Sequence, residues 1–381
     1  MPLFFVLRRK HSRMRIGIDA RMAYYTQAGI GQYIRRLIEG LAKIHPQEEL
    51  VLLQSRKDEA LIRQGRFRRR SLWTPSHHRL EQWLLPLEIA MAGLDILHSP
   101  DFIPPFRRNC RSVITIHDLA FLLYPHFLTR ESARYYGQID QAVRRTDHII
   151  AVSESTKRDT VSLLGVSEKK ITVIHEAANP LFRPVEDPEP LRRVRDKYGL
   201  PEAFILFVST IEPRKNLPTL LRAFRLLLNQ HGPLAKLAVV GKQGWLFEEV
   251  HATVEELNLG QDVLFLGRVP SEDLVLLYNA ARLHVHPSYY EGFGLPPLEA
   301  MICGTPTIVS NVASLPEVVG DAGLLVDPND VEGWAAAIRR LLADPHLRQE
   351  MREKGFQQAQ RFSLERMAQE TLAVYRRVGR K

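Results

Sequence analysis

Residues 283–310, LHVHPSYYEGFGLPPLEAMICGTPTIVS, contain the pattern that indicates the fold. The apolar run over 283–288 is typical of a buried strand, and a glycine-containing turn follows it at Glu291–Gly294. A helix is predicted to begin near Pro296–Pro297, because proline in the first helical turn loses no hydrogen bond. A second apolar run over 306–310 completes a strand–helix–strand unit, which is typical of a parallel sheet.

The same alternation of short apolar runs and longer amphipathic segments continues along the whole chain. In the first half the predicted strands cover residues 14–20, 50–55, 95–99, 112–118, 148–153 and 171–176. In the second half they cover 204–210, 236–241, 263–267, 283–288, 306–310 and 323–326. The sequence therefore predicts an α/β protein with two doubly wound parallel-sheet domains. Ligands bind such sheets beyond the carboxyl ends of the strands, so we expect a site in a cleft between the domains.

A stretch rich in proline and acidic residues, LFRPVEDPEP at 181–190, indicates where the domains meet. We predict an N-terminal domain over 1–182, a connector over 183–202, a C-terminal domain over 203–362 and a terminal helix over 363–381 that packs back on the first domain. The length of 381 residues agrees with two domains of ordinary size. Two distant cysteines, Cys110 and Cys303, argue against a disulfide framework or a thiolate zinc site and favour a reducing compartment.

The positive charge is concentrated in one half of the chain. Residues 1–190 contain 29 Lys and Arg against 21 Asp and Glu, whereas residues 191–381 contain 23 against 22, for a total of +9. This asymmetry suggests an anionic partner for the N-terminal half, either a phospholipid surface, a lipid-phosphate acceptor or a nucleic acid, although a merely basic surface would look the same.

An arginine cluster beside Phe67 and Trp73 is the candidate contact with an acceptor or an anionic membrane, and a solvated loop is the alternative. Its members are Arg63, Arg66, Arg68, Arg69 and Arg70. No apolar run approaches the roughly 18–20 residues that span a bilayer. We therefore expect a cytoplasmic protein, and peripheral attachment to the inner face of the membrane stays open.

The turn after the strand at 283–288 has the composition of an anion site. It consists of Gly292, Phe293, Gly294 and Leu295. The glycines allow close backbone approach, and the free N–H groups and dipole of the helix start favour an anion, so a diphosphate could bind there. Glu291 and Glu299 flank this turn with seven residues between them, and carboxylates accept hydrogen bonds from sugar hydroxyls. The alternative is a surface glutamate at each position.

This segment resembles the EX7E motif of retaining glycosyltransferases. Its continuation, GTPTIVSNVASLPEVVGDAGLLVDPND, is similar to the large GT-B family that contains sucrose synthases and bacterial mannosyl- and glucosyltransferases, often called family four. The resemblance runs from about Met14 to about Asp330 and implies two Rossmann-like domains. It also implies that Glu299 holds the ribose of the donor nucleotide and that Glu291 contacts the donor sugar.

The segment VSTIEPRKN at 208–216 carries the basic residues expected near a diphosphate. Arg214 offers a planar fork and Lys215 a point charge, and the alternative is an exposed basic pair that caps a helix. The resemblance favours the binding role and includes Ser209 in the donor site. Many relatives have Gly-Arg where this chain has Ser209 and Thr210, so Arg214 is a candidate replacement for that arginine.

Three further segments follow predicted strands. Gly29 and Gly31 form a GxG turn that lacks the third glycine of a dinucleotide fingerprint, which argues against a hydride-transfer enzyme. The resemblance implies that this turn approaches the donor phosphates and the acceptor. It also implies that the backbone carbonyl of His117 stabilises positive charge on the sugar. The loop Gly267–Val269, with Arg268 at its centre, resembles the one whose backbone meets the nucleobase.

The resemblance predicts retaining transfer of a hexose from a nucleoside-diphosphate sugar to a hydroxyl of a sugar, polysaccharide or lipid-linked acceptor. The EPRKN segment beside ITIHD resembles bacterial mannosyl- or rhamnosyltransferases of polysaccharide assembly, which makes mannose the first choice. No metal-binding motif appears, so we expect no metal and no cofactor. The resemblance implies that His117 and Glu291 contact the sugar, and together with Arg214 and Lys215 at the diphosphate they are the expected catalytic residues. A sugar-nucleotide epimerase or phosphorylase of the same fold is one alternative. Two further alternatives are a basic nucleic-acid-binding protein and a non-catalytic scaffold. No nucleic-acid-binding motif supports the first of these.

Overall fold

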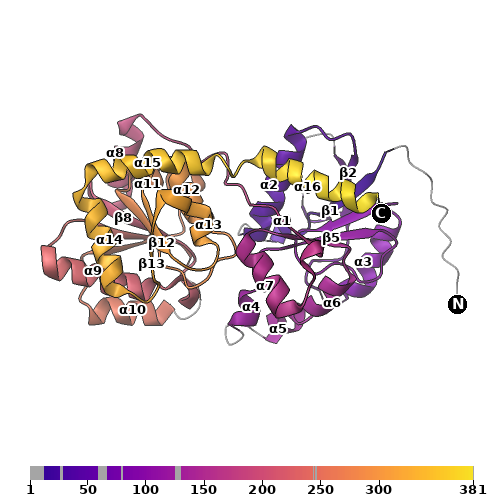
Figure 1. Cartoon of the computed structure of the whole chain (residues 1–381), viewed down its shortest axis with the longest axis horizontal. Coiled ribbons are helices and arrows are strands. Elements are labelled where there is room, and N and C mark those ends of the chain that lie inside the picture. Colours follow the sequence, from indigo (N-terminus) through magenta and orange to yellow (C-terminus); the bar gives the residue numbers. More distant parts are fainter. Residues whose placement is uncertain are drawn as a thin grey trace. The chain divides into compact units, whose positions relative to one another are not determined.

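The computed structural model describes residues 13–25, 29–58, 67–78, 80–124, 130–242, 244 and 247–380. They form two compact units (Figure 1). Unit one runs to Ala177 and takes in the chain again from Leu364, and unit two spans Ala178–Ser363. The segment expected as a connector, 183–202, lies in unit two and contains a helix.

Unit one is built on seven parallel strands in the order β3-β2-β1-β4-β5-β6-β7. The strands are β1 (Arg15–Asp19), β2 (Glu49–Ser55), β3 (Arg68–Leu72), β4 (Ile96–Ser99), β5 (Arg111–Ile116), β6 (His148–Ala151) and β7 (Ile171–Val173). The helices are α1 (Met22–Tyr25), α2 (Gly29–Lys43), α3 (Glu81–Ala90), α4 (Ala120–Leu123), α5 (Arg130–Tyr136), α6 (Ile139–Arg145), α7 (Glu154–Leu164) and α16 (Leu364–Gly379). Helices α2 and α16 cover one face of the sheet, and α3 and α6 cover the other.

Unit two is built on six parallel strands in the order β10-β9-β8-β11-β12-β13. The strands are β8 (Phe204–Val208), β9 (Lys236–Val240), β10 (Val263–Gly267), β11 (Leu283–His286), β12 (Thr307–Ser310) and β13 (Gly323–Val326). The helices are α8 (Pro188–Tyr198), α9 (Leu217–His231), α10 (Phe247–Glu256), α11 (Ser271–Ala280), α12 (Leu295–Cys303), α13 (Leu315–Val319), α14 (Val331–Ala343) and α15 (Pro345–Ala359). Successive residues of β8 pack alternately against α9 and α14 and against α11 and α12, so the predicted doubly wound class is confirmed.

The last helix, α16, completes the core of unit one. Its Tyr375 is fully buried and its hydroxyl lies 2.6 Å from Nδ1 of His98 in β4. Gly40 of α2 faces the start of α16 so closely that a Cβ there would lie 2.6 Å from the carbonyl oxygen of Leu364. The two helices therefore pack at backbone distance.

One strand of unit one was not among the predicted strands. The arginine-rich segment Arg68–Leu72 is the edge strand β3, which pairs with β2. Its exposed arginines break the apolar pattern of a strand, but charge on an edge strand is a usual protection against further pairing. Arg68, Arg69 and Arg70 therefore lie in a sheet and not in a loop, while Arg63 and Arg66 lie outside the described residues. Among the helices of the described chain, none combines the length and apolar character needed to cross a bilayer.

Candidate functional site

The turn between β11 and α12 has a backbone that glycine makes possible. Gly294 has φ of 111°, and a Cβ at this position would lie 2.9 Å from Cδ2 of Leu315. Ser314 closes the turn, because its hydroxyl lies 2.9 Å from the carbonyl oxygen of Glu291 and 2.6 Å from that of Phe293. The helix begins at Leu295, so the turn that contains Gly292 and Phe293 lies at the N-terminus of α12. This is the location that suits a phosphate.

The carboxylate of Glu291 is the centre of a buried polar cluster. Its Oε1 accepts hydrogen bonds from Nζ of Lys215 at 2.7 Å and from Nε2 of His286 at 2.7 Å. The hydroxyl of Ser288 donates a third bond to the same oxygen at 2.9 Å. Oε2 lies 3.5 Å from Nη1 of Arg214. Three donors thus fix one oxygen, and a guanidinium lies beside the other.

The charges in this cluster shift one another's pKa values. Burial would raise the pKa of Glu291, but the Lys215 ammonium and the hydrogen bond from His286 hold it well below its ordinary value. Burial and the Arg214 guanidinium lower the pKa of Lys215, although the carboxylate of Glu291 opposes this shift. Glu291 is therefore an ionised acceptor that two cations surround.

Arg214 and Lys215 belong to a single 3₁₀ turn, Pro213–Lys215, that follows β8. Lys215 is only 8% exposed, so the pair is not the exposed helix cap that was the alternative. Arg214 donates to the carbonyl oxygen of Tyr290 and to Glu212, both at 2.8 Å. These bonds join the end of β8 to the turn after β11, since the two strands are neighbours in the sheet.

Glu299 lies further along α12 and is likewise almost buried. The hydroxyl of Tyr278 donates to its Oε2 at 3.3 Å, which fixes the carboxylate from the side of α11. Both glutamates of the motif therefore have protein partners and neither is an ordinary surface residue, as the alternative would require.

The remaining candidates of unit two lie at neighbouring strand ends. The backbone N–H of Ser209 donates to Val240 at 3.0 Å, and that of Gly241 donates to Gly267 at 2.9 Å. Gly241 has φ of 151° and passes so close to Ser209 that a Cβ there would clash with its carbonyl. The ends of β8, β9 and β10 are thus joined in a row, with Arg268 and Val269 directly after β10.

In unit one, His117 follows β5 and has partners at both ring nitrogens. Nδ1 lies 2.8 Å from Oε1 of Glu176, and Nε2 lies 2.9 Å from the carbonyl oxygen of Pro100. Burial alone would lower its pKa, but the hydrogen bond and charge of Glu176 raise it. The backbone carbonyl of His117 accepts a bond from the hydroxyl of Thr156 at 3.3 Å. Asp118 does not pair with this ring and accepts from Ala120 at 3.0 Å, as expected for a turn cap.

The other candidates of unit one are less enclosed. Gly29 and Gly31 form the first turn of α2, with Gly29 exposed and Gly31 buried. The side chain of Arg68 pairs with Glu49 at 2.8 Å. No group of three metal-binding side chains occurs in the part of the chain that the structure describes.

Sequence reasoning missed the residues that orient these candidates. His286 and Ser288 are within five residues of Glu291, but only the turn brings them onto its carboxylate. Glu176 ends the predicted strand 171–176, and this position at a carboxyl end was the one signal that pointed to it. Ser314 and Tyr278 carry no signal in the sequence.

Two family models match the chain, one for each unit. Residues 28–180 match Glycosyltransferase Family 4, and residues 192–358 match Glycosyl transferases group 1. The chain is also 35% identical over 384 residues to O-antigen chain mannosyltransferase B of Escherichia coli, with 95% of this chain and 100% of that protein covered. It belongs to the group 1, or family 4, glycosyltransferases, and is a hexosyltransferase-type enzyme of this family.

Other similarities agree with this family. The serotype-specific mannosyltransferase WbdA of Escherichia coli is 33% identical over 268 residues, which is 68% of this chain and 33% of WbdA. Sucrose-phosphate synthase (tll1590) from Thermosynechococcus elongatus superposes with a TM-score of 0.77 at 25% identity, over 96% of this chain and 99% of that one. WaaG, a glycosyltransferase involved in lipopolysaccharide biosynthesis, has a TM-score of 0.73 at 17% identity, over 94% and 99% of the two chains, and shows the fold alone. The predicted family and GT-B fold are confirmed.

Proposed function

We propose that the enzyme transfers mannose from a nucleoside-diphosphate sugar to a hydroxyl of a growing polysaccharide or lipid-linked glycan, with retention of the anomeric configuration. The observation that carries this proposal is the similarity to O-antigen chain mannosyltransferase B over essentially the whole of both chains. GDP-mannose is the proposed donor, and the enzyme is proposed to work in the cytoplasm.

The donor half of the proposed mechanism uses the residues of unit two. Glu299 binds the ribose, and the backbone after β10 meets the nucleobase. Glu291, ionised and fixed through Oε1, accepts a hydrogen bond from a hydroxyl of the sugar through Oε2. This division uses one oxygen for structure and leaves the other beside Arg214 for the ligand.

The leaving diphosphate is stabilised by positive charge that the protein already holds. Lys215, Arg214 and the N-terminus of α12 together take the place of a divalent ion, so the proposed reaction requires none. The bond between C1 of the sugar and the diphosphate oxygen breaks, the bond from C1 to the acceptor oxygen forms on the same face, and the acceptor proton passes to the leaving phosphate. The carbonyl of His117 is proposed to stabilise the positive charge on the sugar.

Three measurements test this function. Thermal shift with GDP, UDP, ADP and dTDP identifies the donor base, because a ligand that binds only the folded state raises the transition temperature. Incubation with GDP-mannose and a mannose-containing oligosaccharide, followed by NMR of the product, reports the anomer. An inverted anomer, or turnover without any acceptor, would contradict the proposal. Activity is expected to survive EDTA.

A further inference from the structure

Helix α3 in unit one is apolar on two opposite sides. Its inner side, with Leu85 and Ile89, packs on the sheet. Five large apolar side chains form a second stripe at helical spacing, here called the outer stripe: Leu80, Trp83, Leu84, Leu87 and Met91. They are between 43% and 79% exposed. A helix that is apolar all round is normally buried, so a stripe of this kind indicates a surface that something else covers.

Cations surround the outer stripe. The guanidinium of Arg107 lies 5.3 Å from the ring centre of Trp83. Trp73, 70% exposed, has its backbone N–H bonded to Glu88 of α3 and carries the guanidinium of Arg56 at 3.9 Å from its ring centre. Arg70 of β3 pairs in register with Leu53, which packs beneath α3, so its side chain projects from that same face of the sheet.

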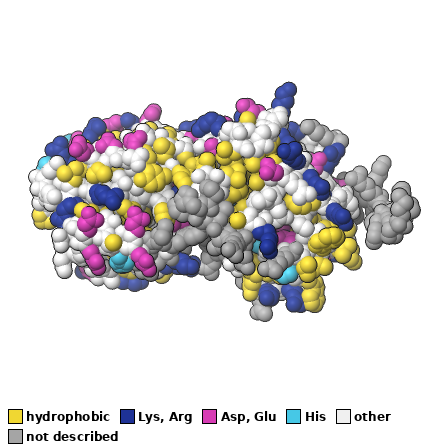
Figure 2. Space-filling model, turned by 90° about the horizontal axis from the view of Figure 1, so that it is seen from below, with side chains coloured by type: hydrophobic (Ala, Val, Ile, Leu, Met, Phe, Trp, Pro, Cys, Tyr) yellow, Lys and Arg dark blue, Asp and Glu magenta, His cyan; other side chains and the backbone are white. Residues whose placement is uncertain are grey.

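Both acids of α3 are engaged with the protein, but among the residues that the structure describes only Glu81 is paired with a cation, so Glu88 keeps its negative charge beside Trp73. Glu88 accepts bonds from the backbone N–H groups of Trp73 at 2.7 Å and Thr74 at 2.9 Å. Glu81 pairs with the buried guanidinium of Arg21. Figure 2 shows apolar side chains gathered beside basic ones at the lower right, where unit one lies. This surface combines exposed tryptophan, leucine and methionine with arginine.

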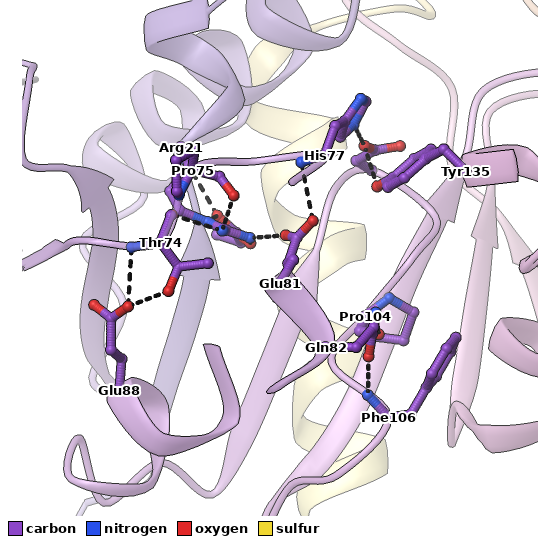
Figure 3. Close-up of polar contacts among 12 residues, drawn as sticks. Arg21, Thr74, Pro75, His77, Glu81, Gln82, Glu88, Pro104, Phe106 and Tyr135 are labelled. Carbon is purple, nitrogen blue, oxygen red and sulfur yellow. Dashed lines mark hydrogen bonds and ion pairs between the residues drawn. The ribbon is translucent and has the colours of Figure 1, made fainter. Parts of the chain in front are cut away.

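The outer stripe is held on a rigid base. Arg21, at the end of β1, donates to the carbonyl oxygens of Thr74 and Pro75 as well as to Glu81 (Figure 3). Glu81 in turn accepts the backbone N–H of His77 at 2.9 Å. The side chain of Gln82 fixes the loop after β4. Its amide nitrogen donates to the carbonyl oxygen of Pro104 at 3.2 Å, and its amide oxygen accepts from the backbone N–H of Phe106 at 2.9 Å. Helix α3 is thus fixed to the sheet, and the outer stripe is already formed before any partner binds.

We propose that the outer stripe, with Trp73 and the flanking arginines, docks this enzyme on the surface of an anionic phospholipid bilayer. Tryptophan and arginine suit the headgroup region, and leucine and methionine suit the boundary with the acyl chains. Ten residues of helix are about 15 Å long, which fits contact along the surface and not passage through it. The choice of a bilayer over a protein partner rests on the lipid-linked acceptor of the proposed function, and the other observations do not depend on it.

The first experiment measures sedimentation of the full chain with vesicles of phosphatidylethanolamine and phosphatidylglycerol, and with phosphatidylcholine vesicles. We expect binding to the anionic vesicles and a blue shift of tryptophan emission. The double variant W83Q/L87Q should bind about tenfold more weakly or worse, because two exposed side chains lose their apolar contact. The matched control L163Q/L234Q replaces exposed leucines elsewhere and should bind like the native chain.

A second arm tests the charge. R56Q/R107Q should weaken binding to anionic vesicles and flatten its salt dependence. Failure of the native chain to bind anionic vesicles would overturn the proposal, as would equal binding by W83Q/L87Q. A dimer that W83Q/L87Q dissociates, with vesicle binding unchanged, would assign the stripe to a second copy instead. Turnover of a soluble oligosaccharide acceptor should be the same in both double variants, so a failed docking test leaves the proposed function intact.

Discussion

Nζ of Lys215 lies 2.7 Å from Oε1 of Glu291, although the two residues are 76 positions apart in the chain. Their strands, β8 and β11, are neighbours in the sheet, and both residues follow the carboxyl ends of those strands. The pair is almost buried, so each charge depends on the other for its stability. The site is therefore a unit in which the donor-binding charges and the local fold are coupled.

Lys215→Ala is expected to slow transfer by roughly 10²–10³-fold, by analogy with the removal of one oxyanion donor. It should also destabilise unit two by about 3–5 kcal/mol, because Glu291 then stays buried without its cation. Single-turnover rates and urea unfolding measure the two effects. Lys354→Ala, which removes an exposed partner of Glu350, is the control and should change neither. Native turnover by Lys215→Ala would refute the assignment of this lysine to the leaving group.

Glu299→Ala should weaken binding of the nucleoside diphosphate by about tenfold to a hundredfold, as expected for lost hydrogen bonds to a charged acceptor. The maximal rate with saturating donor should change much less. Calorimetric titration with the diphosphate measures the affinity, and Glu332→Ala on the exposed side of α14 is the matched control. A reduced rate with unchanged affinity would place Glu299 in the chemical step instead of the ribose site.

Stability should depend on pH through His117. Its pKa is raised in the folded state, so the pair with Glu176 stabilises unit one fully below the ordinary histidine pKa, about 6.5. This contribution is lost as the pH rises through the folded pKa. Glu176→Gln should therefore cost more stability at pH 5.5 than at pH 8.5, as measured by urea unfolding. An equal cost at both pH values would show that the pair is not ionic.

Gly294→Ala should destabilise the turn before α12. The new Cβ would meet Leu315 at 2.9 Å, and alanine rarely adopts φ of 111°. We expect a loss of more than about 1 kcal/mol in the free energy of unfolding, together with weaker binding of the diphosphate. Gly260→Ala is the control, because nothing lies within 4 Å of its added Cβ and its φ is not in the strained region. Native affinity and stability in Gly294→Ala would show that the turn tolerates a side chain.

The sequence predicted the two parallel sheets and the strand ends that carry Glu291, Lys215 and Ser209. It could not predict that Lys215 binds Glu291, because the local periodicity of a sequence does not reveal which strands are neighbours in a sheet. The partnership of His286 with Glu291 depends in the same way on the path of the turn.

The edge strand β3 and the outer stripe of α3 were missed for a different reason. An edge strand made of arginines lacks the apolar alternation by which strands are recognised. A helix with two apolar sides gives no single periodic signal, so sequence alone does not separate its buried side from its exposed side.

The burial of Tyr375 against His98 also has a consequence for synthesis. Unit one cannot close its hydrophobic core until the sixteen residues of α16 have left the ribosome, whereas unit two is continuous in the chain and can fold before them. The part of unit one that precedes Ala178 therefore keeps an apolar face open until α16 has been synthesised. A chain that stops short of Leu364 leaves that part without its final helix and should be a substrate for chaperones and proteases.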